Sequence, residues 1–90
     1  MQLSFNNAHV LTLADLAENE EALLDRIDLP EELAHRLMEL GFVPGHPISV
    51  GRSAPGGDPR VFRVDGSEIA LRRETALHLF VHPPSAKAVS

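Results

Sequence analysis

Residues 28–45 read DLPEELAHRLMELGFVPG, and this stretch carries the clearest structural signal in the chain. Asp28 followed three residues later by Glu31 has the form of a helix capping box. Pro30 suits the first helical turn, where a missing N–H costs nothing. The stretch therefore predicts a short helix, whose apolar positions recur at helical spacing and are Leu33, Leu37 and Leu40.

The same stretch also predicts where the helix ends. Gly41 stands where a residue of positive φ closes a helix, and Phe42 is expected to pack back on Leu37 in a Schellman closure. Leu37 and Leu40 are expected to fill the core. Residues 43–45, Val-Pro-Gly, then turn the chain away from the helix axis.

Outside the helix, the pattern changes to short strands separated by turn residues. Asp65-Gly66 is a strong hairpin signal between two such strands. Residues 55–59, PGGDP, predict an irregular loop because two prolines and two glycines oppose regular structure. The chain is therefore expected to be mainly β, with one or two short helices in a small, partly open barrel. The expected strands are 22–27, 48–52, 60–64, 67–71 and 79–81, with one helical turn at 72–77.

The amino-acid composition excludes several kinds of site and partner. The chain has 90 residues, a formal net charge of -5 and no cysteine, which excludes disulfides, thiolate metal sites and thiol catalysis. An acidic balance argues against nucleic acid as a partner, because phosphate binding needs clustered Lys and Arg. No segment approaches the length of a membrane span, and the N-terminus resembles no signal peptide. We therefore expect a cytoplasmic protein that does not insert into the membrane.

Several short motifs resemble the FeoA family. Residues 36–45, RLMELGFVPG, are similar to the family's arginine-leucine pair and Pro-Gly turn. Residues 54–59 resemble its second block and residues 69–72 its third, in the expected order. The resemblance implies a domain at residues 13–82, and leaves an N-terminal extension at 1–12 and a flexible tail at 83–90.

The family resemblance implies a fold and a function. The fold is an SH3-like β-barrel with an inserted helix. The function is that of a small cytosolic accessory protein, which binds and regulates a membrane permease with a GTPase domain that imports ferrous iron. We expect the partner to dock in a groove between the turn at 43–48 and the loop at 55–59. The candidate partner-binding residues are Phe42, Val43, Pro44, Pro55, Gly57, Asp58 and Arg72.

Two other functions compete with this one. The first is a metal-sensing or metal-binding domain for a divalent transition metal such as Fe2+, with His35, Glu39 and His46 as candidate ligands. The second is a binder of proline-rich peptides, which ranks last because the chain has no Tyr or Trp to line the groove. No nucleophile or phosphate loop stands in a recognisable setting, so an enzyme is not expected.

Overall fold

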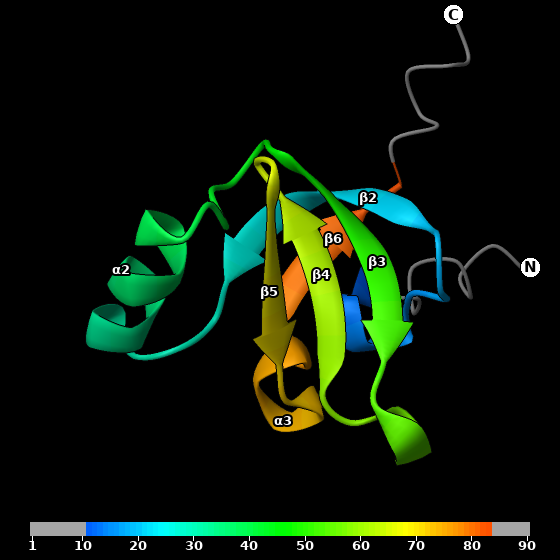
Figure 1. Ribbon diagram of the computed structural model, residues 1–90. Coiled ribbons are helices and arrows are strands. Elements are labelled where there is room, and N and C mark those ends of the chain that lie inside the picture. The colour runs from blue at the N-terminus through cyan, green and yellow to red at the C-terminus, as the bar shows by residue number, and fades with distance from the viewer. Residues whose placement is uncertain (1–10, 84–90) are drawn as a thin grey trace, which may run out of the picture.

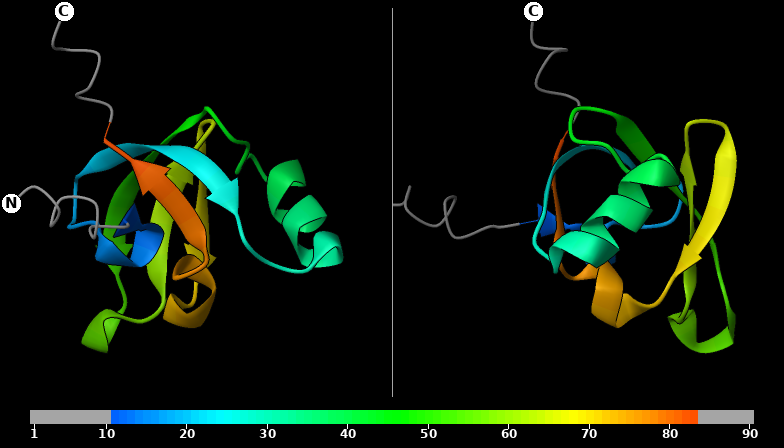
Figure 2. Two further views of the ribbon diagram at one scale, coloured as in Figure 1. Left: turned by 180° about the vertical axis from the view of Figure 1, so that it is seen from behind. Right: turned by 90° about the vertical axis from the view of Figure 1, so that its left-hand side faces the viewer.

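The computed structural model describes residues 11–83, in which six antiparallel strands form one curved sheet in the order β1-β6-β2-β3-β4-β5. The sheet wraps around a single core, and α2 projects from its side (Figures 1 and 2). This arrangement confirms the expected mainly β barrel with an inserted helix. The strands are β1 (Leu11–Thr12), β2 (Glu21–Ile27), β3 (Pro47–Ser53), β4 (Arg60–Val64), β5 (Ser67–Leu71) and β6 (Leu79–His82); the helices are α2 (Glu31–Glu39) and α3 (Arg73–Ala76), with 3-10 turns η1 (Leu13–Asp15) and η2 (Pro55–Gly57).

The β4–β5 hairpin forms as its turn residues predict. Asp65 and Gly66 both have positive φ, 55° and 82°, as a tight two-residue hairpin turn requires. Val64 pairs with Ser67 next to the turn, and the pairing continues to Arg60 and Leu71 at the far end. The hairpin thereby brings the segment before β4 next to the segment after β5.

The C-terminus of α2 also confirms its prediction. The Phe42 N–H donates to the Leu37 carbonyl at 3.0 Å, and the Gly41 N–H donates to the Met38 carbonyl at 3.0 Å. These are the two hydrogen bonds of a Schellman closure, and Gly41 has the positive φ of 118° that it needs. The closure turns Phe42 into the core, where it is fully buried.

The predicted capping box at the start of α2 is wrong. Pro30 is the N-cap residue and receives no side-chain hydrogen bond, while Asp28 lies two residues further upstream. The Asp28 N–H instead donates to the His78 carbonyl at 2.8 Å, so the chain before α2 is held by the segment before β6. A capping box does form at η1. The Thr12 backbone N–H donates to the Asp15 carboxylate, and the Thr12 hydroxyl accepts a hydrogen bond from the backbone of the turn.

The apolar face of α2 is only partly buried. Leu37 enters the core, whereas Leu33 is 37% and Leu40 is 46% exposed. The expectation that Leu40 fills the core is therefore wrong, because the helix stands at the side of the barrel and only one of its turns reaches the interior (Figure 1). The core itself is built by Leu13, Leu16, Ala22, Leu24, Leu37, Phe42, Ile48, Val50, Phe62, Val64, Leu71, Ala76, Leu79 and Val81.

Of two further segments, one agrees with its prediction and one does not. Residues 55–57 are assigned as a 3-10 turn, but Gly56 has a non-helical φ of 90°, so the segment is irregular as its glycines predict. Leu11 and Thr12, assigned above to the N-terminal extension, pair with Val81 and Phe80 of β6. The remainder of the extension at 1–10 and the tail at 84–90 lie outside the described residues. Across residues 11–83, no helix has the length and apolar character needed to cross a membrane.

Candidate functional site

The two segments predicted to form one groove lie at opposite ends of β3. The turn at 43–46 precedes this seven-residue strand and η2 follows it, so about 20 Å of extended chain separates them (Figure 1). Phe42 is 0% exposed and cannot contact a partner in the folded protein. The predicted groove is therefore wrong. Val43 is half-buried and Pro44 exposed at the end away from η2.

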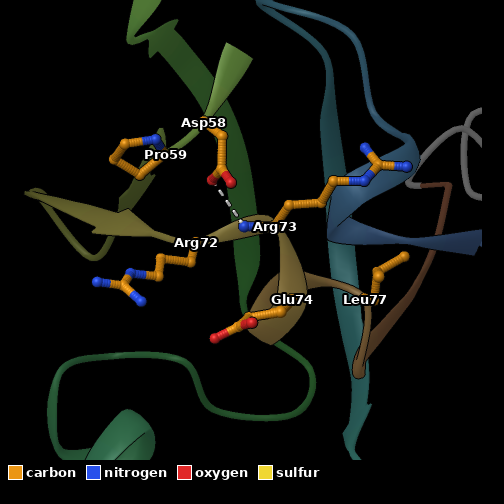
Figure 3. A pocket seen from close by; sticks show the side chains of 6 residues that line it. All are labelled: Asp58, Pro59, Arg72, Arg73, Glu74 and Leu77. Carbon is orange, nitrogen blue, oxygen red and sulfur yellow. Dashed lines mark hydrogen bonds between the residues drawn. The ribbon is translucent and has the colours of Figure 1, made fainter. Parts of the chain in front are cut away.

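A different pair of segments meets at the end of the barrel that carries η2 and α3. The β4–β5 pairing of Arg60 with Leu71 places the residues before β4 beside those after β5. The Arg73 backbone N–H then donates to Asp58 Oδ1 at 2.9 Å, a bond drawn in Figure 3. Asp58 belongs to the second motif block and Arg72 to the third. Two motif blocks separated by a hairpin therefore converge on one surface.

This surface holds an open hollow of about 440 Å³, here called the Leu77 pocket. Leu77, at the end of α3, is 40% exposed and gives the pocket an apolar side chain. The side chains of Arg72 and Arg73 point in opposite directions, so the cationic groups stand on two sides of the pocket (Figure 3). The residues that line the pocket are Asp58, Pro59, Arg72, Arg73, Glu74 and Leu77.

The Leu77 pocket has the chemistry of a protein-binding surface. One exposed leucine lies among two arginines and two carboxylates. A partner can therefore combine an apolar contact with hydrogen bonds to donors and to acceptors. Of the predicted partner-binding residues, Asp58 and Arg72 line it, and Pro55 and Gly57 lie in the adjoining η2 turn. Sequence reasoning missed Leu77 because an apolar residue after a helical turn is equally typical of the core.

The candidate metal ligands are all exposed. His35 and Glu39 lie one helical turn apart on α2, and His46 lies in the turn before β3, where its N–H donates to the Val43 carbonyl. Within residues 11–83, no three His, Asp or Glu side chains are grouped so that they could hold one metal ion. His35 and Glu39 therefore offer a two-ligand helix face, and the metal hypothesis stays a prediction.

Residues 11–83 match the model of the FeoA domain family. The chain belongs to the FeoA family. This assignment confirms the resemblance of the three motif blocks, and the match extends the expected domain at 13–82 by two residues at its start and one at its end. The fold and the family therefore agree.

A curated relative joins two proteins of iron transport in one polypeptide. It is the Fe(2+) transport protein A/Fe(2+) transporter FeoB fusion protein of Porphyromonas gingivalis, to which this FeoA-family chain is 32% identical over 80 residues. The match covers 89% of this chain and 10% of the fusion protein. The chain thus spans about a tenth of that relative's length.

Solved FeoA structures share the fold. The chain is similar to FeoA of Chlorobium tepidum, with 31% identity and a TM-score of 0.78 over 82% of this chain and 70% of that one. It is also similar to Stenotrophomonas maltophilia FeoA, an SH3 domain protein in complex with zinc, with 33% identity and a TM-score of 0.69. That match covers 79% of this chain and 88% of the other. The expected SH3-like fold is confirmed.

Proposed function

We propose that this FeoA-family chain is an accessory protein of ferrous iron uptake that binds and regulates a FeoB-type membrane permease with a GTPase domain. The observation that carries the proposal is the Porphyromonas gingivalis relative, in which transport protein A and FeoB form one polypeptide. Fusion into one polypeptide raises the effective concentration of each module near the other, which favours an interaction between them. The proposal places this chain in the cytoplasm and gives it no catalytic step.

The Leu77 pocket is the surface that we assign to the permease. Support comes from the convergence of two FeoA motif blocks there, through the Arg73–Asp58 hydrogen bond. A partly exposed leucine among charged side chains of both signs is suited to a regulatory contact that forms and breaks, since such interfaces mix apolar and polar groups. The docking residues in this proposal are Pro55, Gly57, Asp58, Arg72 and Leu77.

Loss of this chain should reduce ferrous iron uptake, and restoration should depend on Leu77. We expect deletion of the gene to lower uptake of radioactive ferrous iron, and a plasmid with the unchanged gene to restore it. The Leu77→Ser variant should restore less than half of that uptake, because it removes the apolar contact of the pocket. The matched control is Leu40→Ser, which makes the same change at a similarly exposed leucine at the C-cap of α2.

The outcomes of this experiment separate the function from the surface. Unchanged uptake after deletion would contradict the transport function itself. Full rescue by Leu77→Ser together with poor rescue by Leu40→Ser would keep the function but move the docking surface to α2. Circular dichroism of both purified variants should show an unchanged fold, since both leucines are exposed.

A second candidate function is direct binding of a divalent transition metal. The observation that favours it is the zinc complex of Stenotrophomonas maltophilia FeoA. His35 and Glu39 on α2, with His46 as a separate candidate, are the groups in this chain that could contribute. A saturable zinc or ferrous iron titration that weakens in His35→Ala or His46→Ala would support this function. A titration unaffected by both changes would remove these ligands from consideration.

A further inference from the structure

A second hollow of about 320 Å³ adjoins the Leu77 pocket and shares Asp58 and Arg73 with it. We call it the Arg60 pocket. Its lining includes residues of η1, the end of β3 and the η2 turn, and the end of β3 and the η2 turn lie at the lower end of the barrel in Figure 1. Its polar and glycine lining is formed by Ser53, Gly56, Gly57, Asp58, Arg60 and Arg73.

Arg60 is held in a defined position in this pocket. Its Nη1 donates to the Leu16 carbonyl and its Nε donates to Ser53 Oγ at 3.3 Å. Because a guanidinium carries five N–H donors, these two bonds leave donors free for a ligand. A half-buried, pre-positioned arginine loses little side-chain freedom when it binds an anion.

Arg73 supplies a second cation. In the part of the chain that the structure describes, the ion pair that forms is Arg63 with Glu68, so the Arg73 guanidinium has no carboxylate partner there. Asp58 bonds to the backbone N–H of Arg73 rather than to its side chain. Figure 3 shows the Arg73 side chain directed away from Arg72. The pocket therefore has two guanidinium groups against one carboxylate.

The glycines of η2 leave the pocket open to close approach. Gly56 and Gly57 have φ values of 90° and 87°, and a Cβ added to either would meet no atom within 4 Å. A ligand can therefore lie against the backbone of η2 without contacting a side chain there. This openness suits a peptide segment rather than a group that must be fully enclosed.

We propose that the Arg60 pocket binds the carboxylate of an Asp or Glu side chain on an acidic segment of a protein partner. Planar guanidinium groups match planar carboxylates in bidentate geometry. With Asp58 present, the pocket carries one net positive charge, which complements a monoanionic carboxylate better than a phosphate dianion. The identification of that partner as the permease rests on the function proposed above.

The charge distribution of the chain makes this contact selective. Residues 11–40 contain nine acidic residues and two arginines, whereas residues 41–83 contain five arginines and four acidic residues. An acidic segment is thus repelled by much of the protein and attracted at the Arg60 pocket. Such complementarity fixes the orientation of a complex more than it raises affinity.

The pocket can be tested without the permease. We expect the blocked peptide Ac-Ala-Glu-Glu-Ala-amide to shift the backbone amide signals of Gly56, Gly57 and Arg60 in a saturable NMR titration of the full chain. The glutamine peptide Ac-Ala-Gln-Gln-Ala-amide should leave them unchanged. Arg73→Gln should weaken glutamate-peptide binding at least fivefold. The control Arg52→Gln, which changes an exposed arginine outside both pockets, should not.

Two outcomes would overturn the proposal. One is the absence of peptide binding, and the other is inorganic phosphate that binds at the same amides more tightly than the glutamate peptide.

The purified permease provides the second measurement. Arg73→Gln should lower its affinity for the chain at least fivefold and reduce the salt dependence of binding, and Arg52→Gln should do neither. Peptide binding at the pocket without any permease binding would contradict the proposed function but keep the carboxylate site. The chain could also bind the permease equally well with and without Arg73→Gln and fail to bind the peptide. That result would overturn the carboxylate site and keep the proposed function.

Discussion

Replacing Phe42 with alanine should lower the free energy of unfolding by about 3–5 kcal/mol, as expected for removal of a large aromatic side chain from a core. Phe42 is among the largest fully buried side chains, and it follows directly on the Schellman closure of α2. Small domains have a total stability of only about 5–15 kcal/mol. Urea unfolding followed by circular dichroism should therefore show a much lower midpoint or an unfolded protein.

The control for this change is Phe80→Ala. Phe80 is half-buried on β6, where the Arg26 guanidinium lies 4.2 Å from its ring centroid. The same truncation there should cost less, because part of the ring already contacts water and the cation–π contact contributes only about 0.5–1 kcal/mol at exposed sites. An equal loss in both variants, or a small loss in Phe42→Ala, would contradict the assignment of Phe42 to the core.

Replacing Gly41 with alanine should lower the free energy of unfolding by about 1–3 kcal/mol, the usual cost of an unfavourable backbone conformation. Gly41 has a φ of 118°, which residues with a side chain rarely adopt. An added Cβ would also lie 3.3 Å from the Asp65 Cβ and 3.4 Å from Val64 Cγ2. The closure of α2 would therefore be pushed away from the β4–β5 hairpin.

Gly45→Ala is the matched control for Gly41→Ala. Gly45 also has a positive φ, 95°, but a Cβ at this position would meet no atom within 4 Å. Because both variants carry the strain of a side chain at positive φ, the difference between their free energies of unfolding reports the contact with the hairpin. A larger loss in Gly45→Ala than in Gly41→Ala would contradict close packing between the end of α2 and the hairpin.

Local sequence was sufficient where neighbouring residues decide the conformation. Asp65-Gly66 can adopt two successive positive φ angles at little cost, so the hairpin could be predicted from two residues. Gly41 and Phe42 predicted the Schellman closure for the same reason, since its hydrogen bonds span only six residues. These features need no information about the rest of the chain.

Predictions failed where a distant segment supplies the partner. Asp28 was expected to cap α2, but its N–H is bound by His78, 50 residues later in the chain. Leu40 has the helical spacing of a core residue, yet it is 46% exposed because α2 stands at the side of the barrel. Periodicity identifies which residues share a helix face, but it does not say how much of that face another element covers.

The sequence by itself determined the β4–β5 hairpin, the end of α2 and membership of the FeoA family, because these depend on short-range conformational preferences and on motifs in a fixed order. Only the tertiary structure decided which motif blocks form a surface. The turn at 43–46 and the η2 turn are separated by the full length of β3, whereas the register of β4 and β5 brings Asp58 to Arg73. The physical reason is that strand pairing sets distances between residues far apart in sequence, and local spacing carries no record of that pairing.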